Sequence, residues 1–132
     1  MVCAAPSYWA NHAAPNHPDD LAAHNCLVHP RPGSTFSSWS FTVEGRPVTV
    51  RVAGNRVAND GGVLRQWALD GHGVIMRNAW DIRKELASGA LVTALDTFVT
   101  SNANLYAVTA GSVSSQRVRT FIDFLADNLV AD

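Results

Sequence analysis

Residues 56–69 read RVANDGGVLRQWAL and contain the signals of one strand-turn-helix unit. The run from Arg56 to Ala58 is a strand candidate, and Asn59-Asp60-Gly61-Gly62 is a polar turn rich in glycine. Beyond the turn, apolar residues recur at helical spacing until the glycines at 71 and 73; they are Val63, Leu64, Trp67 and Ala68. The stretch therefore predicts a strand that leads through a tight turn into a helix, as in α/β folds.

The segment downstream repeats this alternation. Val74-Ile75-Met76 reads as a buried strand, 79–88 as a helix closed by Gly89, and 91–95 as another strand. Strands that alternate with helices are typical of a mostly parallel sheet flanked by helices. The sequence thus predicts an α/β fold.

The segment upstream adds two further features. An apolar run at 2–5 predicts a strand, and Pro18 followed by two aspartates predicts the start of a short helix. Residues 39–43 and 48–52 alternate apolar and polar side chains around a glycine turn, which predicts a β-hairpin with one buried face. The four tryptophans are expected in the core or at a subdomain interface, because large aromatic rings dominate burial.

The last third of the chain holds the clearest helix. Polar residues at 97–104 suggest a linker, and 105–108 reads as a strand. A long helix is predicted from Ser114 onward, with one apolar stripe made of Val118, Phe121, Ile122, Leu125 and Leu129. If nothing covers this stripe, the apolar surface favours self-association, and we expect a homo-oligomer.

Length, composition and charge limit the possible functions. The 132 residues suit one ordinary domain, and the formal net charge of −1 supplies no excess positive field for a nucleic-acid backbone. No apolar run approaches the roughly 20 residues that cross a bilayer, and no secretion signal is evident. We therefore expect a globular cytoplasmic domain without membrane contact that does not bind DNA strongly by itself.

Neither a metal site nor a catalytic centre is evident. Cys3, His24, Cys26 and His29 are the metal-ligand candidates, but on a strand residues 24 and 26 face one way and 29 the other. No closely spaced ligand pair, nucleophile elbow or paired base accompanies them. We expect buried thiols, a loop histidine, no cofactor and no enzymatic activity.

The polar turn at Asn59-Asp60-Gly61-Gly62 is the main candidate binding site. Free backbone N–H groups at a helix N-terminus favour an anionic or carbonyl oxygen, and glycine permits close approach. The alternative is that Asn59 or Asp60 merely caps the helix. Arg77 follows a buried strand, where it either presents its guanidinium to a carboxylate or pairs with Asp81 four residues on.

The order of these strings along the chain resembles LysR-type transcriptional regulators. The matching strings begin with Ala5-Pro6-Ser7-Tyr8-Trp9 and continue at 17–27, 39–41, 57–61, 68–74, 105–108 and 117–125. One departure lies at 76–82, where the family often has a proline-containing stretch and this chain reads MRNAWDI. The resemblance implies an effector-binding domain that resembles type 2 periplasmic binding proteins.

The resemblance also implies a division of the chain. Residues 1–97 would form the second regulatory subdomain, and 98–132 would supply the strand and helix that return to an incomplete first subdomain. Such regulators bind a small-molecule effector in the cleft between the subdomains. They reach operator DNA through an N-terminal winged helix-turn-helix, which this chain lacks.

The implied effector-binding residues are Ala5, Asn59, Asp60, Gly61, Gly62 and Arg77. A small polar or anionic metabolite is the expected ligand. The alternatives are a solute-binding protein of a transport system, which the missing secretion signal disfavours, and an α/β enzyme, for which no converging nucleophile and base are evident.

Overall fold

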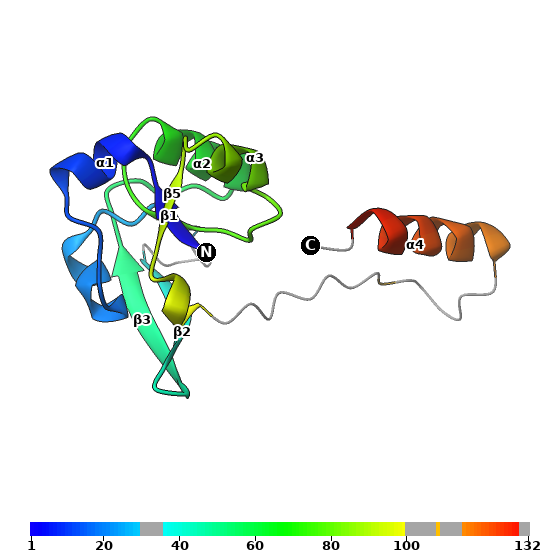
Figure 1. Ribbon diagram of the computed structural model, residues 1–132, viewed down its shortest axis with the longest axis horizontal. Coiled ribbons are helices and arrows are strands. Elements are labelled where there is room, and N and C mark those ends of the chain that lie inside the picture. The colour runs from blue at the N-terminus through cyan, green and yellow to red at the C-terminus, as the bar shows by residue number, and fades with distance from the viewer. Residues whose placement is uncertain (30–35, 100–107, 109–114, 130–132) are drawn as a thin grey trace. The chain divides into compact units, whose positions relative to one another are not determined.

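The computed structural model describes residues 1–29, 36–99, 108 and 115–129. The chain divides into two compact units, Met1–Ser101 and Asn102–Asp132, called unit 1 and unit 2 below. Figure 1 shows the helices α1, α2 and α3 gathered at one end of unit 1, while the tip of the β2–β3 hairpin points away from them. Strands and helices alternate along unit 1, which confirms the predicted α/β class.

The three-stranded sheet of unit 1 is antiparallel, and the parallel pairings next to it are isolated bridges. Strand β1 (Val2–Ala4) lies between β4 (Ile75–Met76) and β5 (Val92–Ala94) and is antiparallel to both. Consequently β4 and β5 run in the same direction. Parallel bridges from Cys26 to Val74 and from Val28 to Val57 continue the sheet beyond β4. Among the described segments of this sheet, β1 alone runs opposite to the others.

Two glycines allow close packing around the peptide of Asn25 and Cys26. A Cβ on Gly73 would overlap the Asn25 carbonyl oxygen, and a Cβ on Gly54 would overlap the Cys26 carbonyl oxygen. The Asn25 side chain joins the same segments, because its Nδ2 donates to His72 O at 2.6 Å and its Oδ1 accepts from Asn55 N at 2.8 Å. The sheet at this point therefore depends on backbone contact that a larger residue would block.

The predicted hairpin is confirmed. Strand β2 (Phe36–Val43) pairs with β3 (Arg46–Ala53), with Trp39 opposite Val50. The inward side chains form one buried face, which consists of Trp39, Phe41, Val50 and Val52. This face belongs to a core cluster that also contains Val28 and Leu21.

The helices of unit 1 are short. They are α1 (Pro6–Asn11), the 3₁₀ turns η1 (Pro18–Ala23) and η2 (Asp96–Phe98), α2 (Gly61–Leu69) and α3 (Arg83–Ala87). The helix predicted at 79–88 is wrong in its first turn, because Asp81 N donates to Asn78 O in a tight turn and α3 begins afterwards. Gly89 follows α3 with φ of +72°, the left-handed conformation predicted for a residue that ends a helix.

A second core cluster packs beneath α2 and α3. It consists of Cys3, Leu27, Leu64, Ala68, Ile75, Ile82 and Leu91. Of the four tryptophans, Trp39 is buried whereas Trp80 is 62% exposed, so Trp80 does not belong to the core of unit 1.

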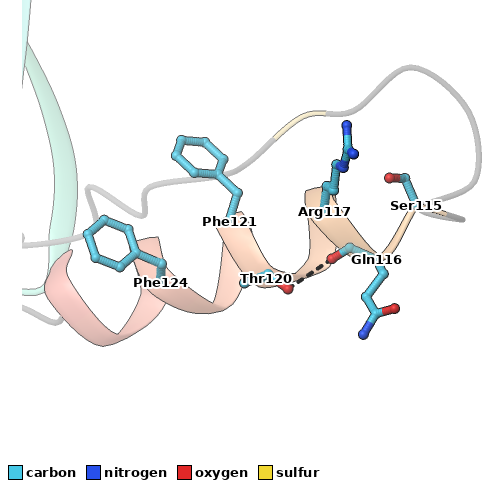
Figure 2. Close-up of a pocket in the computed structure, with 6 residues that line it drawn as sticks. All are labelled: Ser115, Gln116, Arg117, Thr120, Phe121 and Phe124. Atoms are coloured by element: carbon cyan, nitrogen blue, oxygen red, sulfur yellow. Dashed lines mark hydrogen bonds between the residues drawn. The ribbon is translucent and has the colours of Figure 1, made fainter.

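Unit 2 contains the predicted long helix, α4 (Gln116–Leu129). Figure 2 shows Phe121 and Phe124 projecting from the same side of α4, and both rings are more than half exposed. The hollow of about 890 Å³ beside them is lined by residues of this segment alone: Ser115, Gln116, Arg117, Thr120, Phe121 and Phe124. The strand predicted at 105–108 falls outside the described residues except for Val108. No helix in the described ranges is long and apolar enough to span a bilayer.

Candidate functional site

The carboxyl ends of the parallel strands meet at one edge of the sheet. His29, Asn59 and Arg77 follow the strand segments that end at Val28, Val57 and Met76. The first two ends are joined, because in the tautomer that carries a proton on Nε2 His29 donates to Asn59 O at 3.0 Å. In open α/β sheets ligands bind at this edge.

Asp60 caps helix α2. Its Oδ1 accepts hydrogen bonds from Gly62 N at 2.7 Å and Val63 N at 3.0 Å. These two bonds, with a smaller effect from the Arg77 charge, lower the pKa of the Asp60 carboxyl below its ordinary value of 3.8. The capping alternative left open by the sequence is therefore confirmed for Asp60, while a ligand-facing role for this turn stays a prediction.

The charged cap at Asp60 predicts that the stability of the native state depends on pH. Because the folded-state pKa of Asp60 is lowered, its carboxylate stabilises the native state above the unfolded-state pKa, and this contribution is lost as the pH falls through the folded-state value. We expect Asp60→Asn, which keeps a capping oxygen without the charge, to lower the melting temperature at pH 7. The difference between the two proteins should shrink steadily in thermal scans below pH 4. A difference independent of pH would contradict a charged cap.

Arg77 lies directly against the start of α2. A Cβ on Gly61 would overlap Arg77 Nη2 and would lie 2.6 Å from Nη1, so the guanidinium occupies the space that glycine leaves open. Arg77 Nη2 also pairs with Asp81 Oδ2 at 2.6 Å, as the four-residue spacing predicted. Its side chain is 25% exposed, yet its Nε is buried without a hydrogen-bond partner in the described part of the chain.

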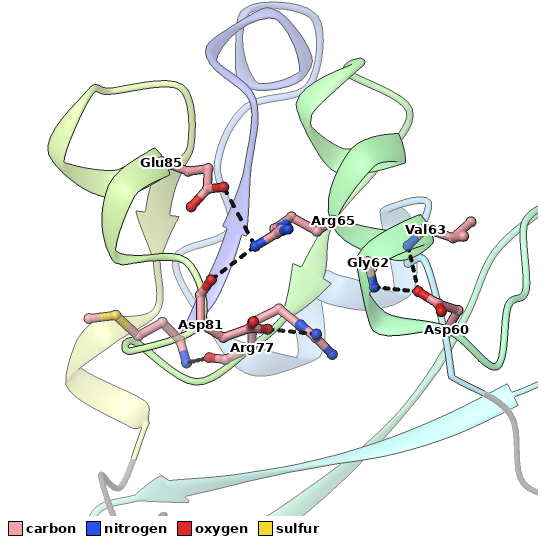
Figure 3. Close-up of polar contacts among 8 residues, drawn as sticks. Asp60, Gly62, Val63, Arg65, Arg77, Asp81 and Glu85 are labelled. Atoms are coloured by element: carbon pink, nitrogen blue, oxygen red, sulfur yellow. Dashed lines mark hydrogen bonds and ion pairs between the residues drawn. The ribbon is translucent and has the colours of Figure 1, made fainter. Parts of the chain in front are cut away.

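The Arg77–Asp81 pair is part of a larger polar network, shown in Figure 3. The Asp81 carbonyl oxygen accepts from Arg65 Nη1 at 3.2 Å, and the same nitrogen lies 3.7 Å from Glu85 Oε1. Arg65 belongs to α2 and Glu85 to α3. The turn at 78–82 is thus fixed between the two helices by charged side chains.

A cavity of about 300 Å³ lies beside Met76 and Arg77. It is lined by Met1, Ser40, Met76, Arg77, Asn78 and Val99. Asn78 and Ser40 were not predicted from the sequence, although Asn78 follows Arg77 at a strand end and carried the same signal. Ser40 comes from the hairpin, and no local pattern places it here.

The structure does not bring Ala5 to this edge. Because β1 is antiparallel to its neighbours, its beginning lies beside Arg77 and its end lies at the opposite edge. Arg77 N donates to the carbonyl oxygen of Met1, the residue before β1, at 2.8 Å. Ala5 is 3% exposed, and its carbonyl oxygen accepts from Tyr8 N at 3.0 Å and Trp9 N at 3.2 Å at the start of α1.

The two cysteine thiols are unreactive at neutral pH. Cys3 and Cys26 are free and buried, and burial raises the pKa of each to about 12. Both are therefore protonated at neutral pH, whereas metal ligation and nucleophilic attack need the thiolate. Within the described ranges, no group of three histidine, cysteine or acidic side chains is arranged to hold a metal ion.

Comparison with known proteins places the chain in a family. The family model described as LysR substrate binding domain matches residues 1–130. The chain belongs to this family. It is 36% identical over 126 residues to the Escherichia coli HTH-type transcriptional regulator DmlR, covering 95% of this chain and 41% of that protein. It is 34% identical over 127 residues to the E. coli activator TtdR, covering 96% and 41%.

Solved structures of the LysR type share the fold. CrgA from Neisseria meningitidis superposes with a TM-score of 0.72 at 26% identity, covering 98% of this chain and 44% of that one. The AphB regulatory domain from Vibrio vulnificus treated with cumene hydroperoxide gives 0.70 at 26%, covering 96% and 62%. The predicted family and fold class are confirmed, and the chain spans about two fifths of the length of the curated relatives reported above.

Proposed function

We propose that this chain is the effector-sensing domain of a LysR-type transcriptional regulator and that its ligand is a small polar or anionic metabolite. The observation that carries the proposal is the position of Arg77. Its partly exposed guanidinium lies against the glycine that begins α2, at the carboxyl edge of the strands. Arginine offers a planar set of donors that matches a carboxylate, and the helix N-terminus adds favourable partial positive charge.

The LysR class also implies how the regulator binds DNA, whether it catalyses a reaction and how it assembles. Operator DNA would be bound through an N-terminal winged helix-turn-helix outside this chain, since the formal charge of −1 offers no basic surface excess. The relatives are named as HTH-type transcriptional regulators, which supports binding rather than catalysis as the role. We also propose that the protein is a homo-oligomer in the cytoplasm. Phe121 and Phe124 are exposed on the apolar side of α4, and such exposed apolar surface favours self-association.

Ligand-induced stabilisation tests the proposal. In the longer regulator that contains this chain, we expect small mono- or dicarboxylates to raise the melting temperature, whereas amines of the same carbon skeleton do not. Binding to the native state adds about 2.7 kcal/mol at a ligand concentration a hundredfold above Kd.

Two variants identify the site in the same assay. Arg77→Gln should abolish the response to carboxylates, and Arg83→Gln, which changes an exposed arginine on α3, should keep it. A full panel without a stabilising carboxylate, or an unchanged response of Arg77→Gln, would reject this function for the site.

A further inference from the structure

We infer that Asp81 is an internal competitor of the effector: its carboxylate occupies Arg77 in the unliganded protein, and a carboxylate of the effector takes its place. This inference rests on the proposed function, because it concerns the same site. It adds a residue that tunes affinity, and it names a carboxylate as the recognised group.

Asp81 leaves the hydrogen bonding of the Arg77 guanidinium incomplete. The pair joins Arg77 Nη2 to Asp81 Oδ2 at 2.6 Å, yet Nε of the same guanidinium is buried with no partner in the described part of the chain. A buried donor without an acceptor is unfavourable, because it has lost its bonds to water. The hydrogen bonding of Arg77 is therefore incomplete when Asp81 is its partner.

The backbone of Arg77 is fixed at the end of β4. Its N donates to Met1 O at 2.8 Å beside β1, and its guanidinium lies in the space beside Gly61. These contacts keep Arg77 at this edge independently of its bond to Asp81.

The Asp81 carboxylate can leave Arg77 while the backbone of Asp81 stays in place. Asp81 N donates to Asn78 O at 3.1 Å, and the Asp81 carbonyl oxygen accepts from Arg65 Nη1 at 3.2 Å. These bonds hold the turn without help from the side chain, which is 24% exposed. Because both side chains of the pair are partly exposed, water and a dissolved carboxylate can reach it and replace Asp81.

A cavity beside Arg77 provides space for the ligand. The cavity of about 300 Å³ has Arg77 and Asn78 on its wall, beside the apolar side chains of Met76 and Val99. Pockets for small molecules begin at roughly this size. The cavity therefore offers room for a small carboxylate beside Arg77.

Asp81→Asn tests the inference, because it removes the competing charge and keeps the size of the side chain. In the longer regulator we expect Kd for a small carboxylate, measured by calorimetry, to fall about two- to fivefold. Glu85→Gln is the matched control: Glu85 contacts Arg65 in the same network but not Arg77, so its loss should leave Kd unchanged. Asp81→Glu, which keeps a competing carboxylate, should not tighten binding as Asp81→Asn does.

The sign of the change separates competition from a structural role. If Asp81 only held the turn in place, its replacement would weaken binding, and an unchanged or raised Kd in Asp81→Asn overturns the inference. That result leaves the proposed function standing as long as carboxylates still bind in an Arg77-dependent way. Absence of such binding in the unmodified protein and in Asp81→Asn rejects the proposed function itself.

Discussion

Gly73→Ala is expected to destabilise unit 1 by about 2–3 kcal/mol or more, the upper part of the range for inserting atoms into a filled interior. The new Cβ would overlap the Asn25 carbonyl oxygen and would lie 3.0 Å from Leu27 Cγ. That carbonyl cannot move freely, because it accepts a hydrogen bond from Val74 N at 2.9 Å beside the parallel bridge between Cys26 and Val74. Relief of the overlap must therefore separate two strand segments.

Urea unfolding followed by far-ultraviolet circular dichroism measures this effect. Gly45→Ala is the control, since Gly45 has φ of +76° at the hairpin turn and no atom near its missing Cβ. Its cost comes from the left-handed backbone alone, about 1–2 kcal/mol. If Gly73→Ala proved no more harmful than Gly45→Ala, the close approach of these strand segments would be wrong.

Local pattern was sufficient to predict most elements of this fold. The glycine turn, α2, the β-hairpin and a cap at Asn59 or Asp60 all depend on residues a few positions apart. The Arg77–Asp81 pair was one of the two alternatives predicted for Arg77, from the spacing of four residues. Periodicity, capping and helical spacing act within one element, so the sequence carries their signals directly.

Contacts between distant segments were not predictable in the same way. Gly61 and Arg77 come from different elements, and nothing in either local sequence indicates that the guanidinium fills the space beside the glycine. The place of Ala5 depends on the reversed direction of β1, which a short apolar run does not encode. The late start of α3 reflects the turn in which Asp81 N donates to Asn78 O, and the Asp81 carbonyl oxygen accepts from Arg65 of α2, a contact between elements.

Phe41→Ala is the second substitution with a large expected effect, a loss of about 3–5 kcal/mol in the free energy of unfolding. Phe41 is 1% exposed and lies in the cluster that joins the hairpin to Leu21 and Val28. Truncation removes the transfer free energy of the ring and leaves a cavity between elements that hydrogen bonds hold in register. The surroundings can collapse only partly, because β2 is paired along its whole length with β3.

Trp80→Ala provides the contrast that makes this prediction specific. It removes a larger aromatic ring, but Trp80 is 62% exposed, so little buried surface is lost and the expected change is within about 0.5 kcal/mol. The two variants should therefore differ widely in urea midpoint, with similar dependence of the free energy on urea concentration. Equal losses of unfolding free energy in both variants would mean that Trp80 is covered in solution. A subdomain interface, one of the two places expected for the tryptophans, would cover it in this way. A small loss in Phe41→Ala would mean instead that the hairpin does not pack on the sheet.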